Sequence, residues 1–223
     1  MDLFDHLAPL WLTLKVATLA TGLALTAGVG VGWLLARKRF WGREWLDALA
    51  SLPLVMPPTV LGYYLIVVLG HNGWLGRWLH AKLDITLMFT WQGAVIAAAV
   101  SALPLVLKSA RAAIEGVDTS LEQAARVLGA AEIAVAWTVT LPLAVRGIVA
   151  GTLLAYARAM GEYGATLMIA GDIPGRTQTL SMAVFDAVQV GDDHLANTLV
   201  FIISAACVLI LVGASQLLKP RYE

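Results

Sequence analysis

Two oppositely charged residues lie four positions apart inside an apolar run of the sequence. Arg158 and Glu162 both fall within residues 143–169, a stretch long enough to cross a bilayer, where an isolated charge would be costly. The spacing places both side chains on one face of a helix, so the two can form an ion pair that neutralises both charges. We expect this pair to form part of a gate or of a joint between helices. A purely structural ion pair is the equal alternative.

Residues 118–142 are the second candidate, because they are too polar to cross a bilayer although apolar runs flank them. Asp118, Thr119 and Ser120 carry the side-chain oxygens that cap helix N-termini. Thr119 and Glu122 have the spacing of a capping box, in which the glutamate reaches back to the start of the helix. We therefore expect a short, capped helix in this segment.

One face of this expected helix is small and apolar. The residues that recur at i, i+3, i+4 and i+7 are Leu121, Ala124, Ala125 and Leu128. Gly129 follows at the position where a left-handed residue would end the helix. The two alanines make the face flat, which suits insertion into a groove of another protein. A short amphipathic helix lying on the membrane surface is the alternative.

The composition is that of a membrane protein rather than a soluble one. Of the 223 residues, 59% are hydrophobic and only 13% are charged, and the mean hydropathy is +0.78. The formal net charge is zero, so no bulk electrostatic attraction to nucleic acid is expected. The single cysteine, Cys207, lies in an apolar run and cannot form an internal disulfide. We expect one all-α transmembrane domain over residues 1–223, surrounded by membrane lipid.

Five apolar runs are long enough to span a bilayer. They follow a short head of residues 1–15 and cover residues 16–36, 49–69, 85–107, 143–169 and 195–218. Pro53, Pro57 and Pro58 in the second run predict a kinked or broken helix that faces other helices. Residues 71–84 are expected to form a loop. The apolar piece at 180–190 is too short to span and is expected to be a re-entrant or surface helix.

Basic residues orient the expected bundle. Ten of them lie on one side: Arg37, Lys38, Arg39, Arg43, Lys108, Arg111, Arg126, Arg146, Lys219 and Arg221. The other side has four, Lys15, Arg77, Lys82 and Arg176. The positive-inside rule then places segment 118–142 and the C-terminus in the cytoplasm and the N-terminus outside.

The sequence lacks the motifs of an enzyme or of a self-powered pump. It contains no Gly-Lys pair and hence no phosphate-binding P-loop. No Ser-His-Asp set, metal-spaced cluster or cofactor motif is present, and His71 and His80 are expected to be solvated loop residues. We therefore expect a non-catalytic subunit without metal or cofactor, which takes its energy from a soluble partner bound at 118–142.

Segment 118–142 also resembles the EAA loop of ABC-importer permeases. The family pattern is Glu-Ala-Ala, three residues, Gly, nine residues, Ile-x-Leu-Pro, and this chain has Gln123-Ala124-Ala125, three residues, Gly129, nine residues and Val139-Thr140-Leu141-Pro142. Gln123 replaces the acid, with Glu122 just before it, and Val139 replaces the isoleucine. Both replacements keep the shape of the side chain.

The resemblance implies roles for these residues. The contact with an ATPase subunit would be made by Glu122, Gln123, Ala124, Ala125 and Gly129. Leu141 and Pro142 would end the loop and set the angle of the fourth span. ATP would close the ATPase pair, and the loop helix would transmit that motion to the spans, so that transport proceeds by alternating access.

Further stretches resemble the molybdate branch of these permeases. They are LPLVMPPTVLG at 52–62, GEYGATLM at 161–168 and GDIPGRTQTL at 171–180. The resemblance implies the type I importer fold and a homodimer in the bacterial inner membrane, with two cytoplasmic ATPase subunits and a periplasmic molybdate-binding protein. Hydrogen-bond donors and a cation near the expected kinks and outer loop are candidates for the substrate pathway: Thr59, Arg176, Thr177 and Gln178. Glu162 would repel a dianion, so its pair with Arg158 is not the expected ligand.

Two alternatives remain. Within the family, the substrate could be tungstate or sulfate, because these oxyanions are so similar in size and charge. Outside the family, the chain could be a stand-alone channel or secondary carrier, since helices broken by proline and glycine are also found there.

Overall fold

The computed structural model describes residues 3–218, with side chains placed for residues 8–213. Its regular elements over that range are all helical, as expected from the composition. The basic residues Lys219 and Arg221 of the expected cytoplasmic tail lie outside the described residues. That the whole chain forms one domain stays a prediction.

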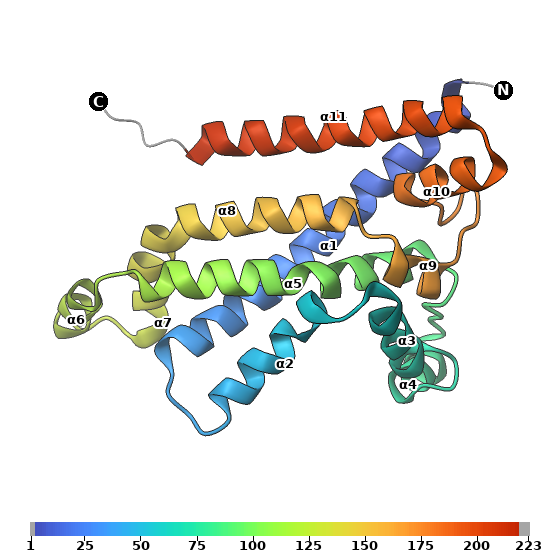
Figure 1. Ribbon diagram of the computed structural model, residues 1–223. Helices are drawn as coiled ribbons and strands as arrows, with labels where there is room; N and C mark the ends of the chain where they lie inside the picture. Colours follow the sequence, from blue (N-terminus) through green and yellow to red (C-terminus); the bar gives the residue numbers. More distant parts are fainter. Residues whose placement is uncertain (1–2, 219–223) are drawn as a thin grey trace.

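The long helices lie side by side, with α6 projecting from one end and the shorter α3, α4, α9 and α10 gathered at the other (Figure 1). Among the described residues, four helices are long and apolar enough to cross a membrane, and five spans result if the bent pair α2 and α3 is one of them. In chain order the elements are α1 (Leu3–Arg37), α2 (Arg43–Val55), α3 (Pro58–Leu69), α4 (Trp74–Leu83), α5 (Trp91–Glu115), α6 (Thr119–Val127), α7 (Glu132–Val135), a π-helical turn (Ala136–Thr140), α8 (Leu141–Met160), α9 (Gly164–Ala170), α10 (Leu180–Val190) and α11 (Asp193–Leu218).

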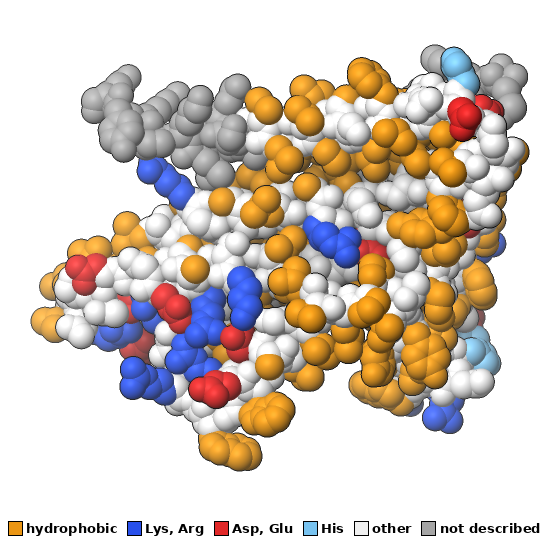
Figure 2. All heavy atoms as spheres, viewed as in Figure 1, with side chains coloured by type: hydrophobic (Ala, Val, Ile, Leu, Met, Phe, Trp, Pro, Cys, Tyr) orange, Lys and Arg blue, Asp and Glu red, His pale blue; other side chains and the backbone are white. Residues whose placement is uncertain are grey.

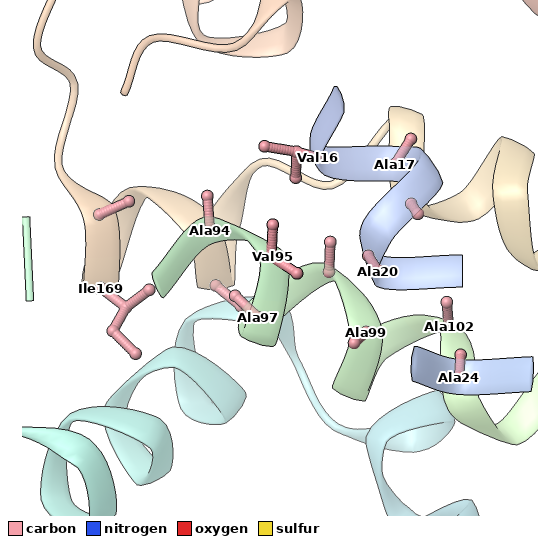
Figure 3. Packing of buried hydrophobic residues seen from close by; sticks show 14 of the residues in the cluster. Val16, Ala17, Ala20, Ala24, Ala94, Val95, Ala97, Ala99, Ala102 and Ile169 are labelled. Atoms are coloured by element: carbon pink, nitrogen blue, oxygen red, sulfur yellow. The ribbon is translucent and has the colours of Figure 1, made fainter. Parts of the chain in front are cut away.

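The core is formed where α1 and α8 pack against α5, and it consists mainly of alanine. Figure 3 shows Ala24 of α1 beside Ala102 of α5, with Ala20 about one turn further along α1. Small side chains let the helix axes approach closely, as is typical of membrane bundles. At Gly151 of α8 the approach is so tight that an added Cβ would lie 2.2 Å from Cβ of Ser109 on α5.

Hydrophobic side chains cover α3, α10 and α11, whereas charged side chains gather near α6 and the adjoining end of α2 (Figure 2). There Asp47 of α2 pairs with Lys108 and Arg111 of α5 at 2.7 and 2.9 Å. None of the α2 residues is buried. These ion pairs join α2 to α5.

The first span begins earlier than the sequence predicts. Residues 16–36 are expected to follow a separate head, but α1 is helical from Leu3, and residues 8–15 belong to the same candidate span as residues 16–36. Lys15 does not interrupt the helix, because its ammonium lies 3.6 Å from the centroid of the Trp91 ring, a cation–π contact that gives the charge a partner.

The proline-rich second span is broken, as predicted. The chain bends by 119° between α2 and α3, with Pro57 and Pro58 at the start of α3. The expected loop at 71–84 is wrong, because residues 74–83 form α4. The third span is shifted, since the Thr90 hydroxyl caps α5 by accepting the Gly93 N–H at 3.2 Å and the helix continues to Glu115.

The expected fourth span, 143–169, is two helices rather than one. Helix α8 ends at Met160, and α9 begins at Gly164 after a turn. The short apolar helix expected at 180–190 is present as α10 with the same limits, and the fifth span corresponds to α11.

Candidate coupling loop and helix junction

Helix α6 is capped at both ends by the residues that the sequence suggests. Asp118 accepts the Ser120 N–H at 2.8 Å, and this backbone hydrogen bond lowers the pKa of the Asp118 carboxyl below its ordinary value. Gly129 has a φ of +87°, a left-handed conformation that glycine adopts without strain. The segment after α6 can therefore turn back sharply toward the bundle.

Glu122 does not form the expected capping box, because its side chain points into the protein. It is 3% exposed, and it forms an ion pair with Arg37 at the end of α1 at 2.8 Å. The same carboxylate accepts the Thr140 hydroxyl at 2.7 Å, and Arg126 lies 3.6 Å away. We call Arg37, Glu122 and Thr140 the loop anchor, because they join α6 to α1 and to the π-helical turn.

The opposite side of the loop is exposed and apolar. Leu128 is 87% and Ile133 75% exposed, and Gln123 and Ala124 also face outward, whereas Ala125 is half-buried. Figure 1 shows α6 projecting beyond the ends of the long helices. Apolar side chains displayed at the most polar end of the molecule are typical of a protein-binding surface.

The sequence suggested that Leu141 and Pro142 end the loop, but in the structure they lie inside a longer helix. The chain is helical from Glu132 to Met160 through α7, the π-helical turn and α8. Before the proline the Leu141 N–H bonds to the Ala136 carbonyl, one residue further back than in an α-helix. This wider turn accommodates a proline that has no N–H to donate. Thr140 of the loop anchor therefore belongs to the same continuous helix as α8.

At the other end of the molecule the two broken helices meet. Gly164, the first residue of α9, lies so close to α3 that an added Cβ would be 2.7 Å from Cβ of Pro58. Thr59 follows Pro58 in the first turn of α3 and is exposed. Discontinuous helices that meet inside a membrane bundle are where transporters bind and gate their substrates.

Arg158 and Glu162 form the expected ion pair at this junction. Their closest atoms are 2.7 Å apart, with the Glu162 side chain 1% exposed and that of Arg158 34% exposed. The second Glu162 oxygen accepts the Ala165 N–H at 3.0 Å. One carboxylate therefore links the end of α8 to the start of α9, which is the arrangement of a joint.

The loop between α9 and α10 holds the remaining candidates, and most of them have internal partners. Thr177 is fully buried; its hydroxyl donates to the Gly171 carbonyl at 2.9 Å and accepts the Ile173 N–H at 3.1 Å. Gln178 donates to Asp186 at 2.8 Å. Arg176 alone among these loop candidates is exposed, so it remains available to an approaching anion.

Asp172 in the same loop is a titratable group that no local sequence pattern singled out. Burial and the neighbouring Asp186 carboxylate raise its pKa to about 6. The sequence does contain two acidic residues, Asp172 and Asp186, on either side of Gln178. Their carboxyl groups come together only because α10 folds back against the loop, which local spacing does not predict.

The fold and the two sites define a class of protein. The structure superposes on a solved structure of the MetNI methionine ABC transporter in an inward-facing conformation, with a TM-score of 0.76 at 18% sequence identity over 98% of each chain. The fold is therefore that of an ABC-importer permease.

Sequence comparison identifies the family. Residues 28–222 match the family described as binding-protein-dependent transport system inner membrane component, and the chain belongs to it. The chain is 44% identical over 204 residues to the molybdenum transport system permease protein ModB of Escherichia coli strain K12, covering 91% of this chain and 89% of the relative. It is 36% identical over 190 residues to the sulfate transport system permease protein CysT of the same strain, covering 85% of this chain and 68% of that relative.

Family membership confirms several expectations together. The chain is a multi-pass inner-membrane subunit that does not itself catalyse ATP hydrolysis. An importer of this class works with an ATPase and with a substrate-binding protein.

Proposed function

We propose that this chain is the permease of a molybdate importer. The observation that carries the proposal is the similarity to the ModB permease over nearly the whole chain. The similar region includes residues 118–142, which we call the coupling loop, and residues 158–164, which we call the helix junction. The same similarity makes sulfate the second candidate, because a sulfate permease is related over most of this chain as well.

The proposed assembly is a homodimer that binds two ATPase subunits on the side of α6 and a periplasmic molybdate-binding protein on the opposite side. The basic residues support this orientation, with the N-terminus outside and the C-terminus in the cytoplasm. The exposed apolar face of α6 supports an ATPase contact there through Gln123, Ala124 and Gly129.

In the proposed mechanism α6 and α8 move together. ATP closes the ATPase pair and displaces α6, and the loop anchor passes the displacement to the helix that contains α8. The joint at Arg158 and Glu162 lets the end of α8 change its angle to α9. Arg176, Thr59, Thr177 and Gln178 remain proposed pathway residues, with Thr177 and Gln178 shaping the loop rather than contacting the oxyanion.

Reconstitution with the ATPase and binding-protein subunits tests the proposal. We expect molybdate-loaded binding protein to stimulate ATP hydrolysis and to deliver molybdate into vesicles, and sulfate-loaded binding protein to do neither. If only sulfate-loaded binding protein stimulated ATP hydrolysis, the chain would be a sulfate permease instead. Transport by the permease without ATPase and ATP would instead show a secondary carrier.

A further inference from the structure

An apolar groove separates α1 from the helix that leads into α8. It has a volume of 640 Å³, with Leu25 and Val29 on one wall and Trp137, Val145 and Ile148 on the other. Helix α1 crosses behind α8, and the two helices diverge toward the α7 end (Figure 1). The groove is thus a consequence of the crossing, and it lies along helices of spanning length.

The groove leads into a polar pocket of 450 Å³ near the loop anchor. Trp33 and Ala136 line both spaces, so one continuous surface passes from apolar to polar. The charged residues around the polar pocket are Arg37, Lys38, Glu122, Arg126 and Glu132.

The charges of this pocket do not cancel. Glu122 is paired with Arg37 at 2.8 Å, and Glu132 is paired with Arg126 at 2.7 Å. Lys38 has no carboxylate within 4.0 Å among the side chains that the structure places, and its ammonium lies 5.9 Å from the centroid of the Trp33 ring. The Lys38 charge also helps to lower the pKa of the Glu132 carboxyl, but three cations face two carboxylates, so an excess of one positive charge remains at the mouth of the apolar groove.

We propose that an anionic phospholipid binds here, with an acyl chain in the groove and its phosphate beside Lys38. A phospholipid has an apolar chain joined directly to an anion, which matches the order of the two spaces. Exposed Trp137 and half-buried Trp33 are the residue type that anchors a helix at the headgroup level. Basic side chains beside a membrane helix attract anionic lipid.

The bound lipid would touch the parts that transmit motion. Its chain packs against both α1 and the start of α8, and its headgroup lies beside the loop anchor. Lipid binding at this position would therefore stabilise the contact between α1 and residues 118–142.

Gly30 and Gly22 supply a matched pair of variants for the test. Both are exposed glycines of α1, and a Cβ added at either meets no atom within 4 Å. Only Gly30 lines the groove. Gly30→Leu should fill the groove without strain, whereas Gly22→Leu adds the same apolar bulk elsewhere on the helix.

The experiment is native mass spectrometry of the permease purified with its ATPase subunits and titrated with phosphatidylglycerol or phosphatidylcholine. We expect preferential retention of phosphatidylglycerol, lost in Gly30→Leu and kept in Gly22→Leu. Lys38→Gln should lower phosphatidylglycerol retention about fivefold and leave phosphatidylcholine unchanged.

Equal retention of the two lipids by the unmodified protein would overturn the proposal, as would equal behaviour of the two leucine variants. If Gly30→Leu split the homodimer while phosphatidylglycerol stayed bound, the groove would be a contact between copies of the chain. None of these readouts depends on which oxyanion is transported.

Discussion

Adjacent residues of the coupling loop face opposite ways. Glu122 is buried against Arg37 and Thr140, whereas Gln123 is exposed on the face proposed to meet the ATPase. The family pattern has its acid at the position of Gln123. In this chain the neighbouring acid holds the loop in place, and we infer that the ATPase meets a neutral amide.

Glu122→Gln tests this division of roles. The amide keeps the size of the side chain but leaves the half-buried Arg37 without its counter-charge, which costs about 3 kcal/mol when one partner of a buried pair is lost. We expect a lower melting temperature and less molybdate transported per ATP hydrolysed. Gln123→Ala is the control and should leave the melting temperature unchanged; if the two variants melted alike, the loop anchor would not stabilise the fold.

Asp172 should make stability depend on pH. Its pKa is raised from 3.8 to about 6, chiefly by burial and then by Asp186, so the folded protein takes up a proton in this range that the unfolded chain does not. Stability from this group is therefore gained as the pH falls through 6 toward 4, and it is lost on the way back up.

The measurement is the melting temperature between pH 7.5 and 5. We expect acidification to raise the melting temperature of the unmodified protein more than that of Asp172→Asn. At pH 7.5 the Asp172→Asn variant should have the higher melting temperature of the two. Asp193→Asn, an exposed acid at the start of α11, is the control and should follow the unmodified protein. If the melting temperature changed equally with pH in all three proteins, Asp172 would not be the source of the pH dependence.

At the scale of elements, the turn after α6 decides how the loop presents itself. Gly129 has a φ of +87° and Gly191, after α10, has a φ of +78°, and a Cβ added at either glycine would meet no atom within 4 Å. A β-branched residue at either should cost about 1–2 kcal/mol through backbone strain alone.

Gly129→Val and Gly191→Val therefore separate strain from coupling. We expect similar losses in melting temperature but a loss of ATP-driven transport only in Gly129→Val, measured in vesicles that contain the full transporter. Gly129 would have no coupling role if that variant still transported and hydrolysed ATP normally.

Local signals predicted some elements well and others not at all. Prolines 57 and 58 predicted the break between α2 and α3, and apolar length predicted α10. The turn between α8 and α9 contains no proline, and it depends on Glu162 capping the new helix. Helix α4 was missed because Gly73 and Gly76 suggested a loop, although the first precedes the helix and the second packs in it.

The partners of Glu122 could not be predicted from local spacing. A Thr-x-x-Glu pattern favours a capping box when the helix is isolated, but Arg37 from the distant end of α1 competes for the same carboxylate. A charge-assisted contact in a buried site is stronger than a neutral backbone hydrogen bond at an exposed helix end. Tertiary packing therefore decided the rotamer.

For the molecule as a whole, the orientation in the membrane follows from charge and can be tested directly. In a Cys207→Ser background, Arg176→Cys should react with a membrane-impermeant maleimide in intact spheroplasts. Gln123→Cys should react only after the membrane is opened. Both positions are exposed, so labelling in the reverse order would show that the bundle is inverted.

The alanine-rich contact of α1, α5 and α8 has a mechanical consequence. A methyl group has no side-chain torsion to adjust, so these surfaces cannot relieve a slip along one another by changing rotamers. Gly147 of α8 also packs tightly against Ala113 of α5, since a Cβ added to the glycine would lie 2.5 Å from the Ala113 methyl. The three helices should therefore move as one rigid body. The flexing that alternating access requires then falls to the breaks between α2 and α3, at residues 56–57, and between α8 and α9, at residues 161–163.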